Sequence, residues 1–143
     1  MFIGEFEHVM DIKGRLAIPA KFRKALLRGA VVTRGLDDSL FLFDIFQWKK
    51  LATKIALLPF SQANMRAFTR LMLAGAMEVI VDTQGRIMIP QYLRTYAKLK
   101  KDVVFVGLYN RVEIWDNALW KQYRQKSEKE SEKIAETLGS LGM

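Results

Sequence analysis

The 143-residue sequence contains no cysteine. Disulfides, thiolate nucleophiles and cysteine-based zinc or iron–sulfur sites are therefore excluded. No apolar run approaches the roughly 20 residues that cross a bilayer, and Glu5 and Glu7 stand where a secretory signal needs a basic start. These absences predict a cytoplasmic protein with no membrane partner.

Residues for catalysis and metal binding are equally scarce. The only histidine, His8, lies in an expected strand with no serine nearby to form a nucleophile–base pair. Glu5, Glu7 and Asp11 do not have the spacing of a calcium-binding loop, and no glycine-rich phosphate-binding motif occurs. The sequence predicts no enzyme, no cofactor and no metal site.

Positive charge is abundant by contrast. Lysine and arginine number 23 against 15 aspartates and glutamates, which gives a formal charge of +8, while half of the residues are hydrophobic. The chain is apolar enough to fold as a globular protein. Its charge favours a partner that carries phosphates, with nucleic acid ahead of an anionic membrane surface.

An internal repeat organises the chain. A shift of 71 residues produces eight identities within positions 4–23, and a shift of 72 adds further matches downstream. The first set pairs Gly4, Glu7, Asp11, Gly14, Arg15, Ile18, Pro19 and Arg23 with Gly75, Glu78, Asp82, Gly85, Arg86, Ile89, Pro90 and Arg94. We call the two units copy one and copy two.

Each copy has the expected element order β-β-α-β-β-α. For copy one the pattern predicts a β-hairpin over 2–10 and 15–18, a helix between Pro19 and Gly29, strands over 31–34 and 40–43, and a helix capped by Asp44. The chain is divided accordingly into repeat 1 (1–48), a helical connector (49–74), repeat 2 (75–120) and a charged C-terminal helix and tail (121–143). Alternating charges in this last segment predict a solvated helix that ends in disorder.

A unit of about 45 residues cannot bury much surface by itself. We therefore expect the copies to interlock their hairpins around one core, related by a pseudo-two-fold axis. The fold class is α+β, mainly β, with flanking helices, and Trp48 and Trp120 are expected packing anchors.

The repeated turns are the strongest functional candidates. In each, an aspartate that initiates a turn (Asp11, Asp82) and a glycine that accepts positive φ (Gly14, Gly85) set the direction of the following arginine. One interpretation is a structural Asp–Arg pair. The other is DNA contact by Arg15 and Arg86, through guanine in the major groove or through phosphate, and the two are compatible.

Further cations surround the turns. Copy one is the more basic and is expected to carry more of the attraction to phosphate, although a plain solvated basic surface is the alternative. The residues concerned are Lys13, Lys21, Arg23, Lys24, Arg28 and Arg34 in copy one, and Arg86, Arg94, Lys98, Lys100 and Lys101 in copy two.

Taken together, these motifs resemble the MraZ family. The resemblance rests on Met1–Glu5, Asp11–Arg23, Asp82–Arg86 and Val112–Asp116, and it extends over nearly the whole chain. It implies two tandem AbrB-like swapped-hairpin units that form one β-barrel. It also implies a bacterial transcription regulator, expected to be a repressor, that binds short G-rich direct repeats upstream of a division and cell-wall gene cluster containing its own gene.

The resemblance further implies a ring-like homo-oligomer, with an octamer as the first expectation, and a nucleoid-associated location. Carried over to this sequence, the family's D-x-x-x-R motif places DNA contacts at Arg15 and Arg86, with Lys13 and Gln84 beside them. We add Lys21, Arg23 and Arg94 as expected contacts from their charge, and double-stranded DNA as the partner.

Three other functions stay open at this point. An oligomeric interaction module, antitoxin-like or a scaffold, would bind nucleic acid without sequence preference. An RNA-binding protein would prefer single strands or A-form duplex, although the turns lack interleaved aromatic residues. An enzyme is the third, and it would require a metal or a pocket lined by carboxylates.

Overall fold

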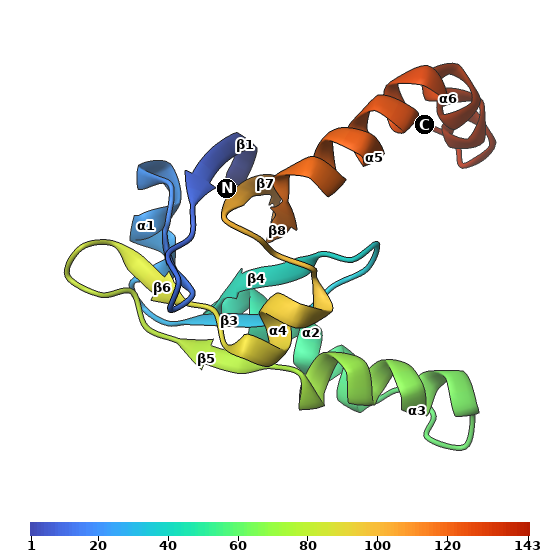
Figure 1. The fold of residues 1–143 in the computed structure, drawn as a ribbon. Helices are drawn as coiled ribbons and strands as arrows, with labels where there is room; N and C mark the ends of the chain where they lie inside the picture. Colours follow the sequence, from blue (N-terminus) through green and yellow to red (C-terminus); the bar gives the residue numbers. More distant parts are fainter.

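A computed structural model describes all residues, 1–143, as a mainly β protein with flanking helices (Figure 1). The strands are β1 (Phe2–Val9), β2 (Arg15–Ala17), β3 (Ala30–Arg34), β4 (Leu40–Asp44), β5 (Met77–Val79), β6 (Arg86–Met88), β7 (Asp102–Tyr109) and β8 (Val112–Asp116). The helices are α1 (Ala20–Leu26), α2 (Ile45–Ala56), α3 (Ala63–Thr69), α4 (Gln91–Tyr96), α5 (Asn117–Lys129) and α6 (Ser131–Ser140), and a π-helical turn, η1, spans Arg70–Ala74. None of the helices has the length and apolar composition of a bilayer-spanning segment.

Both copies have the predicted element order. Strands, helix, strands and helix follow one another as β1-β2-α1-β3-β4-α2 and again as β5-β6-α4-β7-β8-α5. The helix caps are placed as expected: Oδ1 of Asp44 accepts from the backbone N–H groups of Phe46 and Gln47, at 2.9 and 3.0 Å. Asp116, its equivalent, caps α5 through Leu119.

The strands of the two copies are interleaved in one six-stranded sheet. Its order is β1-β7-β8-β4-β3-β5, so exchanging each strand for its equivalent in the other copy reproduces the same order. The approximate two-fold axis therefore passes between β4 and β8. Each first strand leaves its own copy and pairs with the third strand of the other copy, β1 with β7 and β5 with β3.

The predicted hairpin between the first two strands of copy one is wrong. β1 pairs along its length with β7, and only a single bridge, Met10 to Leu16, connects it to β2. β2 instead pairs with β6 in a separate two-stranded sheet, which we call the ribbon. This pairing buries Leu16 and Ile87 side by side in the common core, which a hairpin within one small unit could not do.

The expected closed barrel is also incorrect, because the six-stranded sheet is open. β1 and β5 form its two edges and do not pair with each other. β5 has only three residues, whereas β1 has eight. Such a short edge strand offers too little backbone to close a sheet on itself.

One core joins the two copies. A cluster of 19 buried residues includes Leu16, Ile18 and Phe22 together with their equivalents in copy two, Ile87, Ile89 and Leu93. Each copy thus completes the core of the other. Outside it, two smaller clusters lie on the outer faces of the sheet: Phe41, Phe43, Ile55 and Met72 beneath the helices that follow β4, and Val104, Val106 and Trp115 beneath α5.

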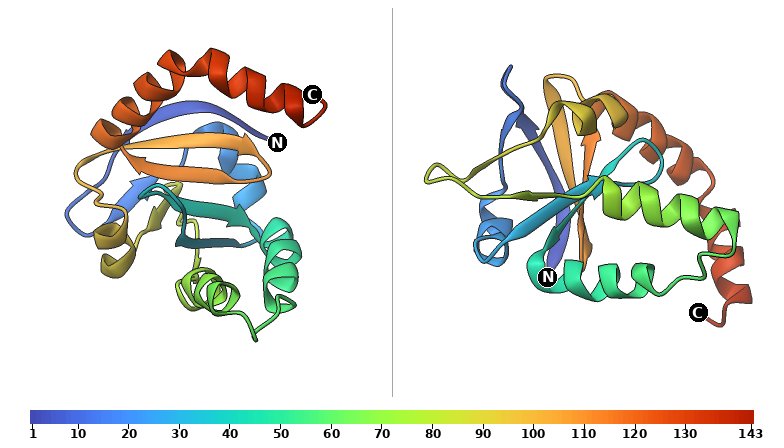
Figure 2. Two further views of the ribbon diagram at one scale, coloured as in Figure 1. Left: turned by 90° about the vertical axis from the view of Figure 1, so that its right-hand side faces the viewer. Right: turned by 90° about the horizontal axis from the view of Figure 1, so that it is seen from below.

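The outer helices differ between the copies. Figure 2 shows α5 and α6 over one side of the sheet, and α2 and α3 on the opposite side. Trp48 packs against the first outer cluster and Trp120 against the second, as predicted. The C-terminal segment is helical and largely exposed, but it remains helical to Ser140, where the charge pattern predicted disorder.

Candidate nucleic-acid interface

Each of the two turns is organised by one aspartate. In copy one, Oδ1 of Asp11 accepts from the backbone N–H groups of Lys13 (3.0 Å) and Arg15 (2.9 Å). In copy two, Oδ1 of Asp82 accepts from those of Gln84 and Arg86, both at 2.9 Å. The turns therefore repeat bond for bond, as the sequence repeat predicts.

The glycine of each turn is required by its backbone and by its neighbours. Gly14 has φ of +86° and Gly85 has φ of +77°, in the region that side chains disfavour. A Cβ on Gly14 would lie 2.6 Å from the carbonyl oxygen of Ile89, and one on Gly85 would lie 2.6 Å from Nε of Arg23. No other residue fits here without displacing these atoms.

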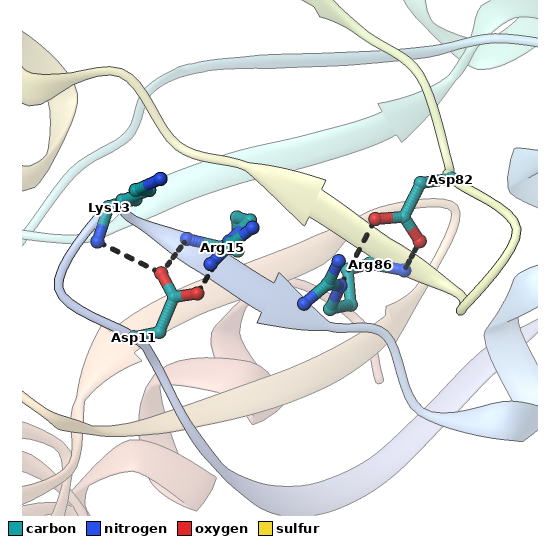
Figure 3. A network of polar contacts seen from close by, with 5 residues as sticks. All are labelled: Asp11, Lys13, Arg15, Asp82 and Arg86. Carbon is teal, nitrogen blue, oxygen red and sulfur yellow. Dashed lines mark hydrogen bonds and ion pairs between the residues drawn. The ribbon is translucent and has the colours of Figure 1, made fainter.

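The aspartates also hold the two arginine side chains. Oδ2 of Asp11 accepts from Nε of Arg15 at 2.5 Å, and Oδ2 of Asp82 accepts from Nε of Arg86 at 3.1 Å (Figure 3). No hydrogen bond engages the terminal Nη1 or Nη2 atoms of either arginine, and the two side chains are 36% and 29% exposed. Each guanidinium is thus fixed on one side and presents its terminal N–H groups to solvent.

These hydrogen bonds further favour the ionised form of the aspartates, which lowers their pKa values. The backbone N–H of Arg15 is the main cause that lowers the pKa of Asp11 below its ordinary value of 3.8, followed among the lowering causes by the hydrogen bond from the Arg15 side chain. The pKa of Asp82 is lowered in the same way by Arg86. At neutral pH both carboxylates therefore orient their arginines as full anions.

The ribbon places both arginines on one surface. Its register pairs Arg15 with Met88 and Ala17 with Arg86, so these four side chains share a face. The alternate residues, Leu16 and Ile87, point into the core. Arg15 and Arg86 are thus diagonal neighbours, which in antiparallel sheets lie about 7–8 Å apart.

One backbone hydrogen bond ties each turn to the other copy. The N–H of Ile18 donates to the carbonyl of Gly85 at 2.9 Å, and the N–H of Ile89 donates to that of Gly14 at 2.8 Å. Every turn is therefore braced by the strand that follows the opposite turn. Movement of one turn relative to the other would break these bonds.

Arg23 and Arg94 lie beside the turns rather than at their tips. The guanidinium of Arg23 packs on Gly85 and its Nε donates to the carbonyl of Ile18 at 2.9 Å. Arg94 packs on Gly14 in the equivalent way, although its buried Nε has no partner. Both side chains are half-buried and support the turn of the other copy.

The remaining sequence-predicted contacts are spread more widely. Lys13 and Gln84 are exposed at the turn tips, and only their backbone N–H groups are engaged by the aspartates. Lys21 lies on α1 with its Nζ 5.9 Å from the centre of the Phe6 ring. The structure therefore brings Lys13 and Gln84 close to the arginines, while Lys21 projects from a separate element.

The structure adds two cations, Lys100 and Lys101, that were not selected as contacts from the sequence. A hollow beside the copy-one turn is lined by Val9, Met10, Asp11 and Ile12 together with three cations of copy two, Arg94, Lys100 and Lys101. The basic run of residues 98–101 was visible in the sequence. Its position beside the opposite turn was not, because that position results from the exchange of strands.

No metal-binding cluster accompanies these features. No group of three or more histidine, aspartate or glutamate side chains is placed to hold a metal ion. His8 is half-buried with its ring 5.5 Å from that of Phe105. Burial, and secondarily the charge of Arg23, lowers the pKa of His8, so the imidazole is a neutral packing group at physiological pH.

Comparison with known proteins assigns the chain to a family. The family model for the MraZ protein, described as antitoxin-like, matches residues 1–71 and again residues 72–140. The chain is 46% identical over all 143 residues to a protein of Caldanaerobacter subterraneus and 47% identical over 143 residues to one of Acetivibrio thermocellus, with both chains covered completely in each comparison. A Natranaerobius thermophilus protein is 50% identical over 138 residues, 96% of each chain.

Each of these relatives is named "Transcriptional regulator MraZ". The family match covers both copies of the repeat, and the relatives align with nearly all of the sequence. The chain with the two braced D-x-x-G-R turns therefore belongs to the MraZ family.

Proposed function

We propose that this protein is a sequence-specific DNA-binding transcriptional regulator that reads DNA with Arg15 and Arg86. The observation that carries the proposal is the presence of two arginines on one ribbon face, each held at Nε by an aspartate and free at its terminal nitrogens. Guanine presents two acceptors, O6 and N7, in the major groove, and they match two guanidinium N–H donors. The chain acts as a regulator and not as an enzyme.

The shape of the ribbon suits this task. A two-stranded antiparallel ribbon fits the major groove of B-DNA, and proteins with such ribbons read bases from their exposed face. The braced turns remove side-chain freedom before binding, which lowers the entropic cost of the contact. The formal charge of +8, with Arg94, Lys100 and Lys101 beside one turn, supplies attraction to the phosphates.

The target and the regulatory effect follow from the family resemblance. We propose that the protein represses a division and cell-wall gene cluster that includes its own gene, by binding short G-rich direct repeats upstream. It would act in the cytoplasm, associated with the nucleoid. Arginine and lysine donors at the turns support a preference for guanine.

We also propose a ring-like homo-oligomer, with eight subunits as the first expectation. Large apolar side chains are exposed on the outer helices and their loops, among them Leu57 (80%), Phe60 (83%) and Leu141 (71%). Exposed apolar groups of this kind mark interaction surfaces when they gather. A ring would present several ribbons to successive repeats and gain affinity through effective concentration.

The test is a gel-shift assay with the DNA upstream of the protein's own gene, against scrambled competitor at physiological salt. Arg15→Ala with Arg86→Ala is expected to abolish the specific shift, since each bidentate contact contributes about 1–3 kcal/mol of discrimination. The matched control is Lys49→Ala with Lys133→Ala, which removes two exposed charges from the outer helices. This control is expected to retain the specific shift.

Two outcomes contradict the proposal. A wild-type shift that scrambled DNA competes equally well indicates an oligomeric interaction module with non-specific nucleic-acid binding. An arginine double variant that unfolds or dissociates to monomer indicates that the Asp–Arg pairs are structural only. Circular dichroism of each variant shows whether it is folded, and sedimentation shows whether it has dissociated to monomer.

A further inference from the structure

The two turns have the same backbone hydrogen bonds but differ in the side chains at their tips. Copy one carries Ile12 and Lys13 where copy two carries Thr83 and Gln84. All four side chains are exposed, and Ile12, at 95%, is the most exposed of the large hydrophobic residues. The approximate two-fold symmetry of the fold is therefore broken at the turn tips, within three residues of the single arginine of each turn.

The tip residues have different hydrogen-bonding chemistry. The lysine ammonium only donates, so with Arg15 it makes the copy-one turn a surface of donors, which matches the O6 and N7 acceptors of guanine. The glutamine amide both donates and accepts, which matches N7 and the N6 amino group of adenine. The apolar side chain of Ile12 cannot form a hydrogen bond with a base edge, so Lys13 is the tip residue of copy one that can.

The ribbon face carries a second asymmetry. Arg15 lies opposite Met88, whose side chain is 55% exposed, whereas Arg86 lies opposite the small Ala17. The two arginines thus stand in different surroundings, one beside a long apolar side chain and one beside a methyl group. A palindromic DNA site presents the same base edges to both halves of the ribbon, so it cannot match two halves whose side chains differ.

We propose that each subunit docks on DNA in a single orientation, which Lys13 and Gln84 specify. The copy-one turn lies over consecutive G·C pairs, and the copy-two turn lies over a step that contains an adenine. The half-sites therefore differ, although the fold alone would favour a palindrome. This inference rests on the proposed function, because it assumes that both turns enter the DNA groove.

The absence of cysteine makes the orientation directly measurable. Single variants Ala20→Cys and Gln91→Cys lie at equivalent, exposed positions at the starts of α1 and α4. Position 20 follows Ile18, which bonds Gly85, so it reports on the copy-two turn; position 91 follows Ile89, which bonds Gly14, and reports on the copy-one turn. Each would be labelled with an iron chelate that cleaves nearby DNA.

The labelled proteins are bound to a duplex with one G-rich repeat from upstream of the gene. We expect each label to cleave one side of the repeat, with the two labels on opposite sides and the position-91 label on the G-rich side. A specific complex in which both labels cleave both sides equally would overturn the single orientation while leaving the proposed function intact. Loss of preference for this duplex over scrambled DNA would overturn the proposed function itself.

A tip exchange tests the role of Lys13. In competition assays with duplexes that carry single G-to-A changes, Lys13→Gln is expected to shift the preference at one position from guanine towards adenine by roughly five- to 100-fold. The control Lys21→Gln removes the same charge on α1 and should weaken all duplexes equally. If Lys13→Gln behaves like this control, Lys13 contacts phosphate and does not specify the orientation.

Discussion

The ribbon and the outer helices of this protein differ in how closely the two copies match. Around the ribbon, every hydrogen bond that Asp11 makes has its counterpart at Asp82, and the braces from Ile18 and Ile89 are likewise equivalent. Beyond β4 and β8 the copies diverge. Copy one continues through α2, α3 and η1, whereas copy two continues through α5 and α6.

The difference follows from how each region is packed. Each turn contacts the other copy, so a change in one alters the support of its equivalent. The outer clusters do not share residues, since one lies beneath α2 and the other beneath α5. The two outer faces can therefore differ in structure while the ribbon keeps its two-fold geometry.

The largest expected difference between the two regions is the change in stability when a glycine is replaced by alanine. Gly14→Ala places a side chain at positive φ, which costs about 1–3 kcal/mol, and forces a close contact with Ile89 that costs about 1–3 kcal/mol more. Urea unfolding should therefore show a large loss of stability. The contrast is Gly139→Ala in α6, where no atom lies within 4 Å of the added group.

Gly139→Ala is expected to stabilise the protein by about 0.5–1 kcal/mol, because alanine is the better helix former. Equal losses of stability at positions 14 and 139 would show that the ribbon is no more constrained than the outer helices. Unfolding midpoints and slopes measured for both variants in the same buffer decide the matter.

A smaller effect is expected when an orienting aspartate is removed. Asp82→Ala raises the net charge by one, so attraction to any DNA should increase slightly. Specific binding should nevertheless fall, because Arg86 loses the partner at its Nε and the turn loses its central acceptor. We expect the ratio of specific to scrambled affinity to drop by about five- to 100-fold in fluorescence anisotropy titrations.

Glu132→Ala makes the same change of charge on exposed α6 and should leave that ratio unchanged. A ratio that falls equally in both variants would mean that charge alone controls binding. A ratio that is unaffected in Asp82→Ala would show that Arg86 needs no orienting partner.

The smallest effect is the dependence of stability on pH. Because folding lowers the pKa of His8 below 6.5, the unfolded chain binds a proton more readily, and stability should decrease as the pH falls below that value. Asp11 and Asp82 have lowered pKa values too, so a second loss is expected as the pH falls below 3.8. Urea unfolding at pH 7.5 and 5.5 tests the first effect.

His8→Gln should remove the loss between these two pH values, because glutamine does not titrate there. An unchanged slope in this variant would assign the pH dependence to another group. The two aspartates belong to the ribbon, so the second loss is expected to be reduced in Asp82→Ala.

Local features were predictable because short-range chemistry specifies them. The order of elements in both copies, the cap at Asp44 and the bends at Gly14 and Gly85 follow from residue types within a few positions of each other. The Asp–Arg pairing in each turn was also predicted as one interpretation, and the structure contains it. The DNA contacts of Arg15 and Arg86 remain a prediction.

Contacts between the copies were harder to predict. The alternation of apolar residues shows that Leu16 faces a core, but it cannot say which strand lies beside it. A hairpin between β1 and β2 satisfied the same pattern and was wrong. The closed barrel that the family resemblance implied was also wrong. Arg23 and Arg94 were selected by charge alone, and their packing on the opposite turns depends on distant residues.

Two equivalent basic turns that each orient one arginine follow from the repeat alone, because each turn is closed by hydrogen bonds within five residues. That the two arginines share one face follows only from the pairing of strands far apart in the chain. That arrangement requires β2 to leave its own copy and pair with β6, which happens because neither copy has enough apolar surface to bury Leu16 or Ile87 alone.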